Sequence, residues 1–427
     1  MTDDASGVPP EPEPAAGSGA STPEPASESV TAPAPATATG PPEGGGRQRL
    51  DRAVLDAIVH GSSTVVTTLA IILALVLGAL IIAFSDTTVL HAWSRFFRHP
   101  GVAISAAFHG GSVGAIFYPL SETASQATPL VLTGLAVALA FRAGLFNIGA
   151  ASQWIGGAIV ATYLGFAVSL PIVIHAIVCL IGGFAGGAVM GWLVGLLKAR
   201  TGAHEVIVTI MLNYVMYDFL SYLLGTPTAL QLPHQANLTS PIIASSAQLP
   251  HVGGPPPQVG VGFLVALVAA AGMWWLLERS TVGFEFRTVG ANPSAARTAG
   301  MSVPRTWILA MLLAGGLAGL SGAVTIQGTF YSLNFQSYGT YGIDGITVAL
   351  LGRARPLGVV LAALLFGALS TGGTVMEAAT SVPVDITEVI EGLIVLFVAA
   401  PLFIRAVFRL REARVGGLGA VAKGWNG

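Results

Sequence analysis

The stretch "SSTVVTTLAIILALVLGALIIAF", residues 62–84, contains no charged side chain. An α-helix rises about 1.5 Å per residue, so roughly 20 residues cross a hydrocarbon core about 30 Å thick. The stretch has that length, and it does not alternate between polar and apolar residues as the strands of a membrane barrel would. It therefore predicts a transmembrane helix.

The remainder of the chain repeats this character. Of 427 residues, 53% are hydrophobic and 9% are charged, whereas a soluble domain is about a quarter charged. The sequence predicts an all-α, polytopic membrane protein with nine or ten transmembrane helices, some of them broken or re-entrant. Besides 62–84, the expected crossings lie near 126–141, 150–167, 171–197, 204–225, 259–277, 306–325, 356–371 and 386–404.

The chain ends differ from this membrane domain, which we place at residues 47–405. Residues 1–46 are dominated by Pro, Ala, Glu, Ser, Thr and Gly, and such a segment cannot bury enough apolar surface to offset the entropy of ordering. We expect a disordered cytoplasmic tail there, and a second cytoplasmic tail at residues 406–427.

Positive charge is distributed unevenly among the predicted loops. Residues 278–305 contain four arginines and the segment after residue 404 is also basic, whereas 226–258 and 326–341 contain neither Lys nor Arg. Basic loops remain in the cytoplasm. We therefore expect both termini and the 278–305 loop in the cytoplasm, and the two neutral loops outside the cell membrane.

With this orientation, one further element must cross the membrane after residue 341. The segment "YGIDGITVALLGR", 341–353, is too short for an ordinary span and predicts a short or broken helix. Broken helices at membrane depth are buried in protein or line a cavity. The glycine-rich segment 102–118 has the same interrupted character.

Glycines recur at helical spacing in two spans, where small residues let helix backbones approach closely. We expect them to serve packing. They are Gly182, Gly183, Gly186, Gly187, Gly191 and Gly195 in the fourth span, and Gly315 and Gly319 in the seventh.

The basic loop contains "RTVGANPSAARTAGM", residues 287–301. Asn292 can cap a helix, Pro293 suits the first helical position, and Gly300 suits the position after the end. We expect a short cytoplasmic helix. Either it is an ordinary loop helix, or it docks a partner, with small residues that allow close contact and Arg297 available to a carboxylate.

This segment resembles the coupling helix of ABC-importer permeases for nucleosides and simple sugars, which are related to the permeases for branched-chain amino acids. Three further blocks are similar in order and spacing, at residues 127–153, 202–215 and 342–369. The resemblance implies a permease domain with a cytoplasmic coupling helix that contacts an ATPase. The implied coupling residues are Gly290, Asn292, Pro293, Ala295, Ala296, Arg297 and Gly300.

The resemblance also implies partners. These are an ABC ATPase subunit, a second permease subunit, an external substrate-binding lipoprotein and the lipid bilayer; a nucleic acid polymer is not expected. The chain has no phosphate-binding loop, and neither of its two lysines, Lys198 and Lys423, is followed by Ser or Thr. We therefore expect no enzyme activity, catalytic residue, cofactor or metal in this chain, with ATP and Mg²⁺ bound by the ATPase.

Some residues depart from the family pattern. Ala151 and Ser152 replace an acidic residue and a glycine, and Ser294 stands where Glu is frequent. These departures concern the identity of the substrate and the fit to a particular ATPase more than the fold.

Polar side chains inside apolar spans are costly and are candidates for function. Both a contact with substrate and a hydrogen bond between helices remain open for each. Most are neutral donors and acceptors suited to hydroxyl or amide groups, and the aromatic ones could pack on a ring. The substrate-path candidates are Phe146, Asn147, Gln153, Trp154, Thr209, Asn213, Asp344 and Thr347.

The resemblance favours nucleosides or related nucleobase or sugar solutes as cargo. The alternatives are a permease for simple sugars or branched-chain amino acids, or a proton-coupled secondary transporter. The last would show membrane-embedded acids and would leave the 287–301 segment unexplained.

Overall fold

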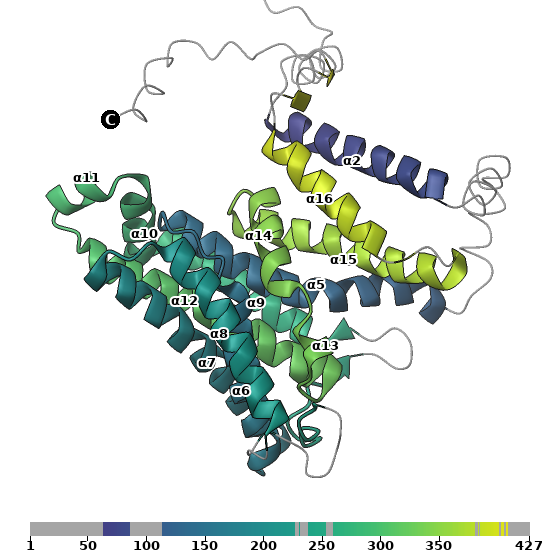
Figure 1. Ribbon diagram of the computed structural model, residues 1–427, viewed down its shortest axis with the longest axis horizontal. Helices are drawn as coiled ribbons and strands as arrows, with labels where there is room; N and C mark the ends of the chain where they lie inside the picture. The colour runs from purple at the N-terminus through teal and green to yellow at the C-terminus, as the bar shows by residue number, and fades with distance from the viewer. Residues whose placement is uncertain are drawn as a thin grey trace, which may run out of the picture. The chain divides into compact units, whose positions relative to one another are not determined.

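The computed structural model of the chain describes residues 63–85, 113–226, 230, 238–252, 259–380, 383, 385–400, 403–404 and 407–408 (Figure 1). Residues 1–54 and 55–427 separate into two units, and every described residue belongs to the second. The predicted tail at 1–46 and nearly all of the one at 406–427 lie outside the described residues.

The described part is built mainly from helices, with a long connection between α8 and α9. Its only strands, β1 and β2, are two residues long and pair antiparallel. The first seven helices are α2 (Ser63–Ser85), α5 (Val113–Arg142), α6 (Ala150–Ala167), α7 (Ile172–Thr201), α8 (Glu205–Gly225), α9 (Val261–Arg279) and α10 (Thr281–Ala291). There follow α11 (Pro293–Thr298), α12 (Val303–Thr325), the π-helix η1 (Ile326–Phe330), α13 (Phe335–Tyr338), α14 (Tyr341–Leu351), α15 (Pro356–Thr380) and α16 (Asp385–Ala399). Strands β1 (His251–Val252) and β2 (Val259–Gly260) lie just before α9.

Six of these described segments are long and apolar enough to cross a bilayer. They are Leu120–Arg142, Ile172–Thr201, Glu205–Gly225, Val261–Arg279, Val303–Phe330 and Pro356–Glu377. Two shorter apolar helical segments, Val66–Leu80 and Tyr341–Leu351, accompany them. The all-α, polytopic membrane fold is therefore confirmed.

Helices α5 and α12 form the centre of the bundle. Side chains of α5 from Val131 to Ala140 are almost all fully buried, and α5 packs against α9, α12, α14 and α15. The predicted glycine packing is confirmed where α7 meets α12: a side chain on Gly187 or Gly191 of α7 would collide with backbone atoms of Gly315 or Met311 of α12. Such backbone approach fixes the two helices against each other.

Of the two segments predicted to be irregular, one is confirmed and the other is not. The short helix expected at 341–353 is confirmed as α14, whose 11 residues span only about 16 Å. Arg353 and Ala354, which follow it, have positive φ angles of 53° and 49°. The interruption predicted over 102–118 is wrong for its described part, because residues 113–118 continue as regular helix into α5. Residues 102–112 lie outside the description.

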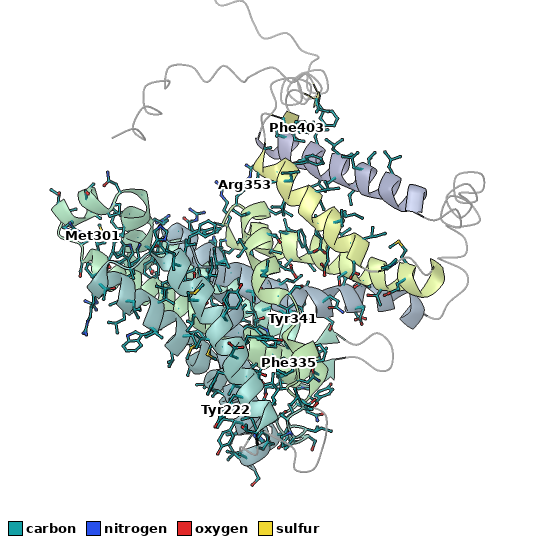
Figure 2. All side chains as sticks on the ribbon, in the orientation of Figure 1. Tyr222, Met301, Phe335, Tyr341, Arg353 and Phe403 are labelled. Atoms are coloured by element: carbon teal, nitrogen blue, oxygen red, sulfur yellow. The ribbon has the colours of Figure 1, made fainter. Side chains whose placement is uncertain are left out.

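The two loops predicted to share the outer face contact each other directly. The backbone N–H of Ser240 donates to the carbonyl of Leu333 at 2.9 Å, and that of Ile243 donates to Tyr331 at 2.9 Å. Buried Gln327 donates to the carbonyl of Ala247 at 2.7 Å. Figure 2 shows Tyr222 and Phe335 at this end of the bundle and Met301 at the opposite end.

Candidate functional site

Helix α11 forms where local sequence predicts it. The Asn292 side chain accepts a hydrogen bond from the Ala295 N–H at 3.0 Å, and Pro293 occupies the first turn. Gly300 follows the helix with a φ angle of +84°, a conformation that favours glycine. The sequence did not predict α10, which directly precedes α11 and begins where Ser280 accepts from the Gly283 N–H at 3.0 Å.

One side chain of α11 is buried against neighbouring helices, and the others are exposed to solvent. Ala296 is fully buried in a small apolar cluster with Val289 of α10 and Val303 of α12. Pro293, Ala295 and Arg297 are exposed. The helix therefore has one face held by its neighbours and another face available to a second protein.

The base of this element is tied to α5. Gly290 of α10 lies so close to the end of α5 that an added Cβ would collide with the carbonyl oxygen of Arg142, and Gly144 meets Gly290 from the other side. Gly290 therefore contacts the bundle rather than the free face of α11. A displacement of α10 and α11 would be passed to α5, because packed backbones leave little slack.

Four polar residues meet in a second place, where the loop after α5 reaches α6 and α8. We call Asn147, Ser152, Gln153 and Asn213 the polar junction. The Asn147 amide donates to Gln153 at 2.9 Å and accepts from it at 3.2 Å. The Ser152 N–H donates to the Asn213 side chain at 2.9 Å, and Asn213 donates to the Ile148 carbonyl at 3.0 Å.

Three of the four residues of the polar junction are closed to solvent, and Asn213 is half-buried. Asn147, Ser152 and Gln153 have no exposed surface, and their hydrogen bonds are made to one another or to nearby backbone. Ala151 is likewise buried against Gly342 of α14, which has no room for a side chain. In this conformation the junction joins helices, and its three buried residues offer no open surface to a solute.

The other predicted path residues are dispersed. Phe146 is exposed and packs on Phe141, with ring centroids 4.9 Å apart. Trp154 is buried beside Tyr341 at 6.2 Å between centroids. The Thr209 hydroxyl donates to the Glu205 carbonyl at 2.8 Å and the Thr347 hydroxyl to the Asp344 carbonyl at 2.7 Å.

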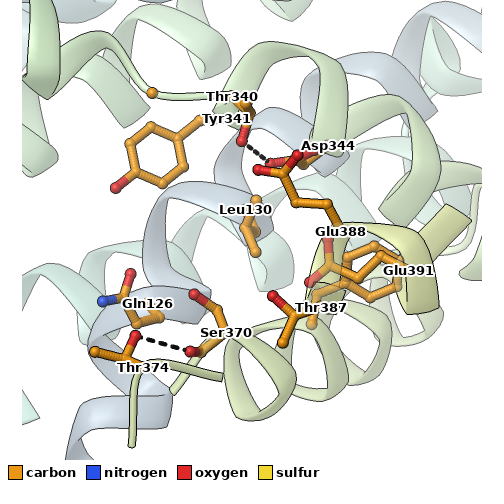
Figure 3. A pocket seen from close by; sticks show the side chains of 12 residues that line it. Gln126, Leu130, Thr340, Tyr341, Asp344, Ser370, Thr374, Thr387, Glu388 and Glu391 are labelled. Carbon is orange, nitrogen blue, oxygen red and sulfur yellow. Dashed lines mark hydrogen bonds between the residues drawn. The ribbon is translucent and has the colours of Figure 1, made fainter. Parts of the chain in front are cut away.

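Asp344, by contrast, faces a cavity of about 280 Å³ between α5, α14, α15 and α16 (Figure 3). We call this the acidic cavity, because Asp344, Glu388 and Glu391 all line it and interact electrostatically with one another. The Thr340 hydroxyl donates to the Asp344 carboxylate at 2.5 Å. The other residues that line the acidic cavity are Gln126, Leu130, Gly339, Thr340, Tyr341, Phe366, Ser370, Thr374 and Thr387.

The acidic cavity can accept hydrogen bonds from a polar solute and can pack on a ring. Carboxylates accept strong hydrogen bonds from hydroxyl and N–H groups, and Tyr341 and Phe366 supply ring surface. Among the described residues, no group of three His, Cys, Asp or Glu side chains is arranged to hold a metal ion.

Comparison with known proteins now identifies the class. The family model described as branched-chain amino acid transport system / permease component matches residues 120–399. The chain belongs to this permease family. The match covers α6 to α16 completely, and α5 from residue 120 onward.

The names of three relatives of this permease state a cargo. The guanosine ABC transporter permease protein NupP of Bacillus subtilis is 39% identical over 81% of this chain and 96% of its own length. The nucleoside ABC transporter permease protein NupB of Lactococcus lactis is 34% identical over 81% and 93%. A glucose ABC transporter permease protein of Haloferax volcanii is 34% identical over 67% and 78%.

The sequence reading of this permease missed most of the acidic cavity. Glu388 and Glu391 lie three residues apart in a helix that is mostly apolar after its first turn, a spacing that places both on one face. That pair of acids inside an expected span was the available signal. Asp344 was recognised, but its neighbours from α5 and α15 are brought to it only by the fold.

Proposed function

We propose that this chain is the membrane-spanning permease subunit of an ATP-driven importer of nucleosides. The observation that carries the proposal is the similarity to the guanosine permease over 81% of this chain. The glucose permease supports sugars as the second candidate, and the family description keeps branched-chain amino acids as a third.

The proposed assembly contains a second permease subunit, ABC ATPase subunits and an external substrate-binding lipoprotein. ATP and Mg²⁺ are bound and used by the ATPase, so this chain needs no cofactor. The relatives named as permease proteins support this division of labour. Residues 47–405 form the permease domain, with nine or ten crossings and both termini in the cytoplasm. The opposite placement of α11 and of the contacting 238–252 and 326–341 loops supports this orientation.

The acidic cavity is the proposed part of the substrate path. A nucleoside presents ribose hydroxyl and base N–H donors, which match the carboxylates of Asp344 and Glu388, and a flat base, which matches the rings of Tyr341 and Phe366. The residues of the polar junction do not contact the substrate; they hold α6 and α8 in register.

One helix joins the proposed coupling site to this cavity. ATPase closure displaces α11, α10 transmits the movement through the Gly290–Gly144 contact, and α5 carries it to Gln126 and Leu130 in the cavity wall. The transition is a change between two arrangements of packed helices, biased by nucleotide and by the loaded binding protein.

The substrate is tested by uptake in cells from which this chain has been deleted. Radiolabelled guanosine, ribose, glucose and leucine are each offered to deleted cells and to cells complemented with the wild-type chain. Loss and restoration of guanosine uptake alone is the expected result. Restoration of glucose or leucine uptake instead would replace nucleosides by that cargo.

The energy source is tested in the same cells. Uptake that survives a protonophore but stops when cellular ATP is depleted is expected. Uptake that stops with the protonophore at constant ATP would show that transport is coupled to the proton gradient instead of to ATP.

Coupling through α11 is tested by the double variant Pro293→Gly and Arg297→Glu. We expect guanosine uptake to fall to background, because the helix start is loosened and the exposed charge is reversed. Arg200→Glu, at the exposed end of α7, is the matched charge-reversal control. Full uptake in the double variant at normal membrane abundance would rule out α11 as the coupling element.

A further inference from the structure

A surface groove between α9 and α15 lies apart from α11 and the acidic cavity. It consists of an apolar cavity of about 390 Å³ and a polar cavity of about 550 Å³ that share Trp274, Pro356 and Leu357. Leu267, Ala271 and Val360 line the apolar part. The two parts therefore form one continuous depression with different chemistry at its ends.

The polar end is cationic. Arg142, Arg279 and Arg355 line it, and the carboxylate there, Glu278, is already paired with Arg287 at 3.0 Å. In the described part of the chain, no carboxylate lies within ion-pair distance of those three lining arginines. Among the described residues, the groove end thus holds an excess of positive charge without a counterion.

The arginines lie where lipid headgroups would be. Arg142 and Arg279 end α5 and α9, and Arg355 directly precedes α15, so all three mark span ends. From there the apolar part continues along the spans, with Leu357 72% and Trp274 49% exposed. Tryptophan is typical of the membrane interface, where one end of its ring system is wet.

Two contacts prepare this end for an anion. The Arg142 Nε donates to the Ala354 carbonyl at 2.9 Å, which orients its guanidinium, and the Arg279 guanidinium lies 5.9 Å from the centroid of the Trp274 ring. Guanidinium groups bind phosphate oxygens bidentately. The remaining donors of the three arginines are available to such a group.

We propose that this groove binds one anionic phospholipid, with its phosphate at Arg142, Arg279 and Arg355 and an acyl chain along Leu267, Ala271 and Leu357. Basic pockets between transmembrane helices bind anionic headgroups in this way. The continuous apolar part selects a lipid over a free phosphate, which would use only the cationic end. This inference does not depend on the cargo.

Trp274 provides the test, because it belongs to both parts of the groove. The full chain is reconstituted in vesicles of brominated phosphatidylglycerol or brominated phosphatidylcholine, and bromine quenches the fluorescence of nearby tryptophans. The quenching at Trp274 is the quenching of the wild-type chain minus that of the Trp274→Phe variant. We expect quenching at Trp274 to favour phosphatidylglycerol in mixed vesicles. Arg279→Ala with Arg355→Ala should reduce this preference by about fivefold for each arginine.

Two further variants separate the alternatives. Arg200→Ala with Arg305→Ala removes two exposed arginines outside the groove and should leave the preference unchanged. Ala271→Phe, which fills the apolar part but keeps the arginines, should abolish it. An unchanged preference in Ala271→Phe, together with competition by inorganic phosphate, would overturn the proposal in favour of a free anion.

Two other outcomes also contradict the lipid site. Equal quenching by both lipids in the wild-type chain would show that the groove does not select the headgroup. If Trp274 is quenched in the isolated chain but by neither lipid in the assembled importer, the groove is a contact with another subunit.

Discussion

The polar junction and the acidic cavity place similar side chains in opposite situations. At the junction, Asn147 and Gln153 bond to each other and have no exposed surface. At the cavity, the carboxylates of Asp344, Glu388 and Glu391 line about 280 Å³ of space. A polar residue inside a membrane span is therefore a path candidate only when the protein itself leaves some of its hydrogen-bonding capacity unused.

The two regions also differ in what a substitution would remove. At the junction, a lost partner leaves a buried amide unsatisfied, which costs about 1–3 kcal/mol of folding stability. At the cavity, a lost carboxylate removes an acceptor that faces open space. Stability and transport should therefore respond separately in the two regions.

The largest effect is expected at the cavity, for Asp344→Asn combined with Glu388→Gln. Each change removes a charge-assisted acceptor and should reduce guanosine uptake about tenfold, since such a bond contributes about 1.5–3 kcal/mol. Initial uptake rates, normalised to the amount of permease in the membrane, measure the loss.

The matched control for the cavity is Asp218→Asn, on α8 outside the cavity lining. Its normalised uptake should remain near wild type. A loss equal to that of the cavity variants would show that uptake responds to acid removal generally.

An intermediate effect, on stability rather than transport, is expected for Gln153→Leu. The change removes the side-chain partner of buried Asn147, so the free energy of unfolding should fall by about 1–3 kcal/mol. Thermal unfolding of the purified chain measures this. Uptake per folded molecule should stay within about twofold of wild type, and a tenfold loss at unchanged stability would place Gln153 in the path.

The smallest effect is expected for Thr347→Val. Its hydroxyl is bonded to the carbonyl of Asp344 in the same helix, and its side chain is not part of the cavity lining. The near-isosteric change should alter normalised uptake by less than about twofold. A tenfold loss would mean that the cavity extends to the next turn of α14 during transport.

Local signals allowed α11 and α14 to be predicted from sequence. Asn292, Pro293 and Gly300 act through backbone geometry within a few residues, and the length of the 341–353 segment alone excludes an ordinary span. Helix α10 was missed because its start depends on Ser280, a single cap without an apolar pattern long enough to indicate a span.

The acidic cavity could not be assembled in the same way. Asp344 and Glu388 are separated by all of α15, and Gln126 comes from α5, so only the packing of those helices joins them. The sequence identified polar residues inside spans, but it could not distinguish Asn147, whose bonds are satisfied, from Asp344, which faces a cavity.

Cysteine accessibility tests the central distinction most directly. The chain has one cysteine, Cys179, which is buried, so Cys179→Ala provides a background for Ser370→Cys in the cavity and Ser152→Cys in the junction. Cells that carry the complete importer with either variant are treated with a small thiol reagent, with and without guanosine. We expect the Ser370→Cys chain to react and guanosine to protect it, while the Ser152→Cys chain stays unreactive. Reaction and protection at Ser152→Cys, with none at Ser370→Cys, would contradict the account.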